Sequence, residues 1–288
     1  MREYSRIFRV RYYELDSFAH VNNAVYVNYL QEAAIEASSD AGFTPTWYRE
    51  RGVGWVIRKI SIRYYFPASY QDELKVRTWI SGIRRVSSTR EYTIERAGDG
   101  APVVRATINW VFINRGSGLP TRIPNEFTSA FGTTGSAHKL EIRWTNPTQT
   151  ENAYRYRHRR RVQTNELDTA RHVNHTAYIR WVEQAYFDAM RAAGHPIENT
   201  RDGEWSILQG AHEIEYFEPA FDNEEVEVVS WVCELGKVRG AWVHEILSVT
   251  RQVLLARDYS VGVFVNRSGR PVSAPAQVIK DVVLGPGR

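Results

Sequence analysis

The chain has 288 residues, of which 43% are hydrophobic and 12% aromatic, and its formal net charge is +4. A length about twice the roughly 150 residues typical of one domain predicts two units of similar size, and the apolar content excludes a disordered chain. Because no run of about eighteen apolar residues occurs, we expect no membrane-spanning helix, and the small positive charge predicts no nucleic-acid partner.

The cysteine content and the first residues bear on the compartment. Cys233 is the single cysteine, so no intramolecular disulfide can form within the chain. The first six residues lead into strand-like sequence without the apolar segment of a secretory signal. Both features predict a reducing, cytoplasmic location.

A strand, a loop and a helix come first in chain order. Alternating residues predict a strand at 8–12, and residues 14–22 read ELDSFAHVN. Tyr26, Leu30, Ala33 and Ala37 then follow one another at the spacings of three and four that are typical of a helix, and Gly42 is a residue that ends helices. Segments with a period of two predict antiparallel strands at 60–66, 73–80, 89–94 and 103–113.

The same order of elements returns in the second half of the chain. Residues 166–174 read ELDTARHVN, which matches 14–22 at six of nine positions with an offset of 166 − 14 = 152. That offset also pairs Tyr26 with Tyr178 and Trp79 with Trp231. It predicts a strand at 156–162, a helix through Tyr178, and strands at 212–217, 224–232, 241–250 and 253–265. The sequence therefore predicts two copies of one α+β unit, in which a sheet wraps a helix.

The segment between the copies has the composition of a linker. Residues 123–153 contain small and turn-forming residues, in the stretch 131–137 and at Asn146-Pro147, and have no periodicity. We therefore expect domain 1 at 1–125, a linker at 126–153 and domain 2 at 154–280.

The order strand, Asp-x3-His-Val-Asn loop, long helix and antiparallel strands resembles the hotdog fold. It is similar in particular to the 4-hydroxybenzoyl-CoA thioesterase-like branch, and the duplication resembles the acyl-ACP thioesterases, which fuse two hotdogs in one chain. The resemblance implies two tandem hotdog domains, each a long central helix wrapped by an antiparallel sheet, forming an intramolecular pseudo-dimer whose pockets are lined by both copies.

The resemblance also implies an activity. Members of this branch hydrolyse acyl thioesters of coenzyme A or acyl carrier protein to a free acid and a thiol, within fatty acid metabolism and with no cofactor or metal. We expect an acyl-CoA or acyl-ACP thioester as the substrate, and further self-association to a homo-oligomer is plausible.

Thioester hydrolysis needs an attacking group and donors for the developing oxyanion. Asp16 and Asp168 come just before a helix, where the first backbone N–H groups, around 21–23 and 173–175, carry the positive end of the helix dipole. We expect the Asp to act as general base on water or as nucleophile, and the amides to form the oxyanion site. His20 and His172 are expected to orient the Asp or to bond the thioester.

Four further polar residues of the loops and helices are site candidates. Asn22 and Asn174 precede the helices and are expected to shape the loops and cap the helices. Glu32 and Glu183 lie within the helices, where related enzymes can place an acidic residue, although a solvated helix face is the commoner explanation. Glu218 lies one position from an acidic site of the plant-type enzymes, but Pro219 occupies the aligned position.

Departures from the family pattern bear on the carrier. Phe18 and Ala170 stand where the acyl-ACP enzymes carry an Asn two residues after the Asp, so the resemblance favours thioesters in general. Basic residues that are candidates to meet phosphates of the ligand are Arg58, Lys59, Arg84, Arg85, Lys237 and Arg239. The dense basic segment 155–161 is either a solvated strand edge or an anion-binding rim.

Three alternatives compete with hydrolysis: another reaction, binding without reaction, and a metal site. Hotdog enoyl-thioester hydratases resemble this loop but place five residues from Asp to His, whereas the step here is four, 172 − 168. A non-catalytic acyl-thioester binding protein would have the same pocket and helix. Asp168, His172 and His175 offer zinc ligands, but Asn23 replaces the last of them in the first copy.

Overall fold

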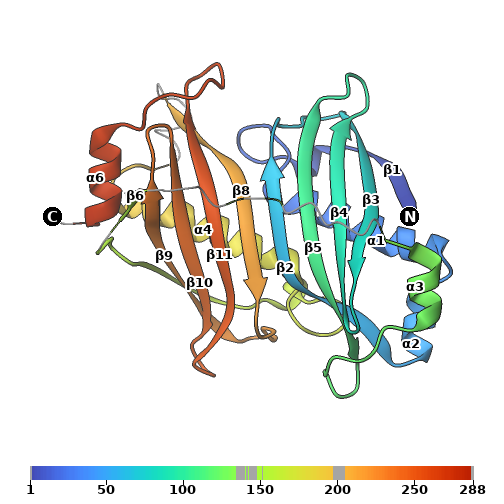
Figure 1. Cartoon of the computed structure of the whole chain (residues 1–288). Coiled ribbons are helices and arrows are strands. Elements are labelled where there is room, and N and C mark those ends of the chain that lie inside the picture. The colour runs from blue at the N-terminus through green and yellow to red at the C-terminus, as the bar shows by residue number, and fades with distance from the viewer. Residues whose placement is uncertain are drawn as a thin grey trace. The chain divides into compact units, whose positions relative to one another are not determined.

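The computed structural model describes residues 2–133, 140, 142, 148–150, 152–196 and 205–286 (Figure 1). The chain separates into two compact units, Met1–Glu141 and Ile142–Arg288, here unit 1 and unit 2. In each unit one long helix runs across one face of an antiparallel sheet (Figure 1). No helix in the described ranges is both long and apolar enough to cross a membrane.

Unit 1 has a five-stranded antiparallel sheet. Its strands are β1 (Glu3–Arg9), β2 (Val53–Tyr64), β3 (Glu73–Ile83), β4 (Ser87–Arg96) and β5 (Pro102–Asn114), in the spatial order β1-β3-β4-β5-β2. Alternate residues are buried, as Leu74, Val76 and Thr78 on β3 show. This period of two is the one the sequence predicted, and it gives the sheet one face toward the core.

The long helix of unit 1 is α1 (Asn23–Asp40). Its apolar stripe buries the side chains of Tyr26, Leu30 and Ala33 against the sheet, which confirms the helix predicted from their spacing. The helix ends before Gly42, whose φ of 93° lies in the left-handed region that glycine adopts at low cost.

Two short helices of unit 1 were not predicted. They are α2 (Pro45–Glu50) and α3 (Asn125–Phe131). Phe127 and Phe131 of α3 pack on Phe43, with ring centroids 4.9 and 6.1 Å from it. The segment expected to be a linker, 126–153, therefore begins with a helix that belongs to the core of unit 1. Much of the remaining linker, 134–139, 141, 143–147 and 151, lies outside the described residues.

Unit 2 repeats this architecture. Its strands are β6 (Thr148–Gln149), β7 (Tyr156–Arg161), β8 (Ser206–Tyr216), β9 (Glu225–Leu235), β10 (Arg239–Ser248) and β11 (Val253–Val265). The order is β7-β9-β10-β11-β8, and β6 pairs with the end of β9. The long helix is α4 (His175–Ala192), and α6 (Ala276–Leu284) packs on the same core through Val278 and Val282.

The duplication extends to irregularities of the backbone. The helices α1 and α4 have 18 residues each and begin 175 − 23 = 152 positions apart. The bulge in β3 at Ser81 recurs in β9 at Cys233, and the bulge in β2 at Arg58 recurs in β8 at Gly210, both with the same offset. Because bulges are specific features of a fold, their recurrence confirms that the two units are copies of one structure.

Candidate active site

The two ELD-x3-HVN segments, residues 14–22 and 166–174, are called the motif loops. Each closes as a tight hairpin, with Leu15 bridging Val21 in unit 1 and Leu167 bridging Val173 in unit 2. Ala19 and Arg171, at the tips, have φ of 60° and 65°. Non-glycine residues adopt this left-handed conformation at a cost, so the surrounding contacts must hold the loops in place.

The Glu that opens each motif loop is a structural anchor. Nη2 of Arg160 lies 2.6 and 2.7 Å from the two carboxylate oxygens of Glu166, and Nε1 of Trp181 on α4 donates to the same carboxylate at 2.9 Å. In unit 1, Glu14 accepts a hydrogen bond of 2.5 Å from the hydroxyl of Tyr29 on α1. The motif loop is thus tied to the long helix in both copies.

Asp168 faces His172 across the motif loop of unit 2. Its Oδ2 lies 3.4 Å from Nδ1 of His172, and its Oδ1 accepts a hydrogen bond of 2.7 Å from the amide of Ala170. About 30% of each of these two side chains is exposed, 29% for Asp168 and 31% for His172, so both groups are within reach of a ligand. The structure therefore brings together the acid and the imidazole that the sequence predicted to act together.

Asp16 is held differently in the motif loop of unit 1. Its Oδ1 accepts hydrogen bonds from the amides of Phe18 and His20, at 2.8 and 3.1 Å. Among the described residues, the imidazole of His20 makes no ion pair with Asp16. In both copies Oδ1 of the Asp accepts from backbone amides of its own loop, and the copies differ in that Asp168 also has an imidazole, that of His172, at 3.4 Å.

Asn22 and Asn174 cap the long helices, as predicted. Oδ1 of Asn22 accepts from the amide of Ala24 at 3.0 Å, and Oδ1 of Asn174 accepts from the amide of Thr176 at 2.9 Å. These are the bonds by which an N-cap side chain satisfies the first turn of a helix.

The predicted oxyanion donors are mostly occupied, which corrects part of the sequence-based expectation. In unit 2 the amide of Val173 donates to the carbonyl of Ala220 at 2.9 Å, and that of Asn174 donates to the backbone carbonyl of Glu166 at 2.8 Å. The amide of His175, the first residue of α4, donates to no acceptor in the described part of the chain. Of the three predicted donors in unit 2, this is the one without an acceptor in that part of the chain.

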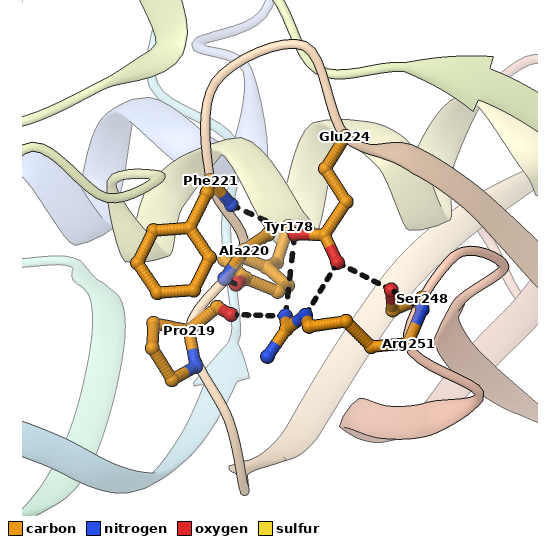
Figure 2. A network of polar contacts seen from close by, with 7 residues as sticks. All are labelled: Tyr178, Pro219, Ala220, Phe221, Glu224, Ser248 and Arg251. Atoms are coloured by element: carbon orange, nitrogen blue, oxygen red, sulfur yellow. Dashed lines mark hydrogen bonds and ion pairs between the residues drawn. The ribbon is translucent and has the colours of Figure 1, made fainter.

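A turn beside the motif loop holds it in position, and Figure 2 shows its polar contacts. The carbonyl of Ala220 accepts from Val173, and the amide of Ala220 donates to the hydroxyl of Tyr178 on α4 at 2.9 Å. Nε of Arg251 donates to Glu224 at 2.8 Å, and Nη2 of Arg251 donates to the carbonyl of Pro219 at 2.6 Å.

The same turn exists in unit 1. Nε of Arg96 lies 3.4 Å from Oδ2 of Asp72, its Nη2 donates to the carbonyl of Pro67 at 3.2 Å, and the amide of Ala68 donates to Tyr26. Sequence reasoning missed these residues because the Arg positions differ by 251 − 96 = 155, outside the offset of 152 that aligns the rest. The acid also differs, Asp in one copy and Glu in the other.

The helical carboxylates lie away from the motif loop of their own unit. Glu32 is exposed on α1, 4.0 Å from Nη1 of Arg6. Glu183 lies eight residues beyond His175, about 12 Å along α4. Burial lowers the pKa of the His212 imidazole on β8, but neighbouring carboxylates, with Glu183 among them, outweigh this and raise it.

The predicted basic positions fall into two groups. Arg84, Arg85, Lys237 and Arg239 are exposed at the turns β3–β4 and β9–β10, and Arg58 is exposed at its bulge. The basic segment of β7 is instead paired within unit 2.

In that segment Arg157 and Arg159 lie 2.6 and 2.8 Å from Glu227, and Arg155 stacks over Trp231. These contacts favour the interpretation of the segment as a strand edge.

Two further observations concern ligands: the size of a cavity in unit 2, and the arrangement of possible metal-binding side chains in the described residues. An apolar cavity of about 30 Å³ lies between α4, α6 and the sheet, where Tyr186, Met190 and Trp242 contribute to its walls. Its volume suits water and is far too small for an acyl chain. Among the residues that the structure describes, no group of three or more His, Cys, Asp or Glu side chains is placed to hold a metal ion.

The chain belongs to the thioesterase-like superfamily. The model of that family matches residues 10–131 and 162–282, so each unit matches it separately and both motif loops lie inside a match. This agrees with the resemblance that the motif loops suggested, and it assigns two hotdog domains to one chain.

Curated relatives are acyl-carrier-protein thioesterases by name. Palmitoyl-acyl carrier protein thioesterase, chloroplastic, of Cuphea hookeriana is 27% identical over 186 residues, which cover 61% of this chain and 45% of the relative. Acyl-acyl carrier protein thioesterase ATL2, chloroplastic, of Arabidopsis thaliana is 33% identical over 124 residues, which cover 43% and 65%. The chain spans about half the length of most of the curated relatives it matches.

Solved structures share the fold over nearly the whole chain. The 12:0-ACP thioesterase from Umbellularia californica superposes with a TM-score of 0.73 at 19% identity and covers 93% of this chain and 94% of its own. An acyl-ACP thioesterase from Bacteroides thetaiotaomicron gives 0.70 at 17% identity, with 91% and 98% covered. At these identities the likeness establishes the double hotdog fold.

Proposed function

We propose that the chain hydrolyses acyl thioesters and that Asp168 of unit 2 is the residue on which the reaction depends. One observation carries this proposal: the carboxylate of Asp168 faces His172 in the motif loop that leads into α4, whose first amide, that of His175, has no acceptor in the described part of the chain. Membership of the thioesterase-like superfamily supports the reaction class.

The reaction follows from the roles these groups can take. Asp168 accepts a proton from a water molecule, whose oxygen then attacks the thioester carbonyl carbon. The oxyanion that forms accepts a hydrogen bond from the amide of His175, and removal of such a donor typically costs about 3 to 4 kcal/mol of barrier. The carbon–sulfur bond then breaks, and the thiolate takes up the proton that Asp168 had accepted, directly or through His172 or water, so that the free acid and the thiol leave and Asp168 is ionised again.

Attack by Asp168 itself is the second route to the same products. A carboxylate oxygen then bonds to the acyl carbon as the thiolate leaves, and water hydrolyses the resulting mixed anhydride. Both routes require the carboxylate to be ionised and reachable, and the exposed fraction of 29% for its side chain meets the second condition.

Unit 1 is assigned a supporting role in this proposal. Asp16 has two backbone amides on one carboxylate oxygen, and among the described residues it makes no ion pair with a histidine. Such bonds stabilise the loop conformation around the positive φ of Ala19. We therefore infer that the carboxylate of Asp16 shapes its loop, while that of Asp168 serves the reaction.

For the carrier we propose acyl carrier protein or coenzyme A, with the former favoured by the names of the relatives. The exposed basic residues of the strand turns, Arg84 and Arg85 in unit 1 and Lys237 and Arg239 in unit 2, offer positive charge to an acidic carrier or a phosphate. Comparison of thiol release from one acyl group on the two carriers decides between them.

The histidines give a direct test with a matched control. His172→Gln removes the imidazole that faces Asp168 and is expected to lower kcat for thiol release by about 100-fold, as for loss of a general acid or base. His20→Gln is the equivalent change in unit 1 and is expected to retain most activity. Equal losses in both variants would contradict the assignment of unit 2. Binding of acyl thioesters without any release by the unaltered chain would instead indicate a binding protein.

A further inference from the structure

Tyr216, the last residue of β8, reaches from the sheet of unit 2 to the first turn of α4. Its hydroxyl donates to the carbonyl of His175, the first residue of that helix, at 3.0 Å. His212 and Ile214, which precede Tyr216 at intervals of two, are buried, so all three side chains share one face of the strand. The bond therefore joins an inward-facing strand residue to the residue whose amide is the proposed oxyanion donor.

The ring of Tyr216 is held by two aromatic contacts with α4. It meets the ring of Tyr178 edge-on, with centroids 5.3 Å apart and an interplanar angle of 85°, and the imidazole of His175 edge-on at 6.5 Å. The hydroxyl of Tyr178 in turn accepts from the amide of Ala220, in the turn beside the motif loop. These contacts orient the phenol so that its hydroxyl points at the first turn of the helix.

The carbonyl that Tyr216 binds belongs to a peptide group that is held at both ends. This group joins His175 to Thr176, and its N–H donates to Oδ1 of Asn174, the cap of α4, at 2.9 Å. A hydrogen bond at one end of a peptide group polarises it and strengthens the bond at the other end. Tyr216 and Asn174 therefore clamp the peptide group that follows His175.

The proposed oxyanion donor belongs to the peptide group on the other side of His175. The carbonyl of that group, which is the carbonyl of Asn174, accepts from the amide of Ala177 at 2.9 Å. With the following group held by Tyr216, both peptide groups that flank His175 are fixed. This matters because a donor stabilises the transition state most when it already points at the charge that develops.

Tyr216 stays protonated over the ordinary pH range. Burial raises the pKa of its hydroxyl well above the ordinary value of 10, and the nearby Tyr178 and Asp258 raise the pKa further. Such a phenol is poorly suited to act as an acid or a base near neutral pH. Its contribution is therefore the hydrogen bond that it donates to the helix.

Unit 1 has the same pair of tyrosines in a looser arrangement. Tyr64 occupies the position of Tyr216, since 216 − 64 = 152, and its hydroxyl lies 3.4 Å from the carbonyl of Asn23. The rings of Tyr26 and Tyr64 have centroids 5.8 Å apart and are tilted by 47°. Because O–H···O hydrogen bonds usually measure about 2.5 to 3.0 Å, the contact at the helix start is weaker in unit 1.

We propose that Tyr216 is a positioning residue for thioester hydrolysis, and that it acts by fixing the amide of His175 in the direction of the oxyanion. The inference rests on the proposed function, because it assigns a role within that same site. Tyr216 keeps its proton and its bond to the carbonyl throughout the reaction, and it acts only through the helix.

A double-mutant cycle tests the proposal. Tyr216→Phe removes the hydroxyl and keeps the ring, and it is expected to lower kcat for thiol release about 10-fold with little change in KM, because the oxyanion forms only in the transition state. His175→Pro removes the amide hydrogen at the first helical position, where proline is well tolerated, and is expected to lower kcat about 100-fold. His175→Ala keeps the amide and is the reference for loss of the imidazole.

The combined variant decides whether Tyr216 acts through that amide. In the His175→Pro background, Tyr216→Phe is expected to change kcat by less than about two-fold, since the donor that it positions is already absent. Multiplication of the two effects, to about 1,000-fold, would overturn the proposal. An unchanged kcat in Tyr216→Phe alone, with kcat lowered in His175→Pro, would overturn it as well and leave the proposed function standing. Full activity in His175→Pro would contradict the oxyanion assignment itself, and this inference with it.

Tyr64→Phe is the matched control in unit 1. It removes the same atom at the equivalent position, so it should retain kcat, and its loss of stability in urea titrations should be no greater than that of Tyr216→Phe. Melting temperatures of both variants establish that they are folded at the assay temperature. An equal loss of kcat in Tyr64→Phe would indicate general loosening of the fold and would overturn the proposal.

Discussion

Asp16 and Asp168 occupy one position in two copies of the same loop, yet different groups bind their carboxylates. Two backbone amides bond Asp16, whereas one amide and an imidazole contact Asp168. Side-chain imidazoles commonly take part in proton transfer, so the position of His172 beside Asp168 is the basis of the role proposed for unit 2. At the residue scale, the two copies therefore differ in the contacts of one carboxylate while keeping the same loop.

The N-cap residues allow stability to be separated from activity. Asn174→Ala and Asn22→Ala each remove the cap hydrogen bond to a backbone amide, and Asn174→Ala also removes the bond from the hydroxyl of Thr176. Each is expected to lower the free energy of unfolding by about 1 kcal/mol or more in urea titrations. Only Asn174→Ala is expected to lower kcat, because it loosens the first turn of α4 beside Asp168 and the amide of His175. Similar kcat values for the two variants would argue against an active site in unit 2.

The sequence was informative about these residues to different degrees. Asp168, His172 and Asn174 stand in a motif that occurs twice, and the structure places them together at the start of α4. The role of Glu166 could not be predicted, because its partner Arg160 lies on the preceding strand and Trp181 on the following helix. The occupied amide of Val173 was likewise hidden, since its acceptor, Ala220, is 220 − 173 = 47 residues away.

At the scale of elements, the turn that carries Ala220 links the sheet to the motif loop. Its acid, Glu224, accepts hydrogen bonds from Arg251, from the amide of Phe221 and from the hydroxyl of Ser248 (Figure 2). Burial alone would raise the pKa of Glu224, but these hydrogen bonds outweigh it and lower the pKa below its ordinary value of 4.5.

This pKa predicts how the turn responds to acid. Because the pKa of Glu224 is lower in the folded chain, the stability that the network contributes is present above about pH 4.5 and is lost as the pH falls through the lowered value. Glu224→Gln should lower the free energy of unfolding by about 3 kcal/mol at pH 7, since it leaves Arg251 without its buried partner. The difference from the unaltered chain should shrink toward pH 3.

Chemical unfolding at pH 7 and at about pH 3 measures this effect, and Glu218→Gln is the control. Glu218 is exposed on the same turn, so its substitution should change stability little at either pH. A pH-independent loss of stability in Glu224→Gln would show that the carboxylate charge does not stabilise the turn.

The long elements of both units could be predicted, and the short ones could not. The helices α1 and α4 and most strands have clear periods and the structure confirms them, although β2 and β8 begin seven and six residues earlier than predicted. The first strand was placed too late, at 8–12, because β1 ends at Arg9 and Tyr12 lies in a short 3-10 helix. The helix α3 has seven residues, too few to show a period, and α6 follows a proline-rich turn at the end of the chain. Their buried residues pack on distant parts of the chain, which local sequence does not reveal.

At the scale of the whole molecule, the two copies differ in the buried groups that titrate. Burial lowers the pKa of His244 to about 4, whereas unit 1 has Tyr92 at the equivalent position. The folded unit therefore keeps a neutral imidazole that the unfolded chain protonates below about pH 6.5. The resulting stability is present above pH 6.5 and is lost between about pH 6.5 and 4, to a total of about 3 kcal/mol.

Acid unfolding is accordingly expected to begin in unit 2. Hydrogen exchange measured during thermal melts at a series of pH values tests this expectation. As the pH is lowered, the amides of β10 should lose protection at a higher pH than those of β4. His244→Gln keeps a hydrogen-bonding side chain that does not titrate, and it should remove much of this difference. Simultaneous loss of protection in β4 and β10 of the unaltered chain would contradict the expectation.

Duplication also gives the chain two equivalent units, of which unit 2 carries the candidate active site. Unit 2 has the Asp168–His172 pair and large apolar side chains at its core, while in unit 1 backbone amides bond Asp16. The repeat was evident from sequence, but this division of properties was not, because it depends on which donors and acceptors meet in the folded units.

The measurement that tests the account most directly is thiol release from acyl-ACP and acyl-CoA by the unaltered chain, Asp168→Asn and Asp16→Asn. The two substitutions change the same atom at the same position of each copy. The account predicts that Asp168→Asn loses nearly all of kcat, about 1,000-fold or more, while Asp16→Asn keeps most of it and loses some stability. Full activity in Asp168→Asn, or an equal loss in Asp16→Asn, would contradict the assignment of the reaction to unit 2.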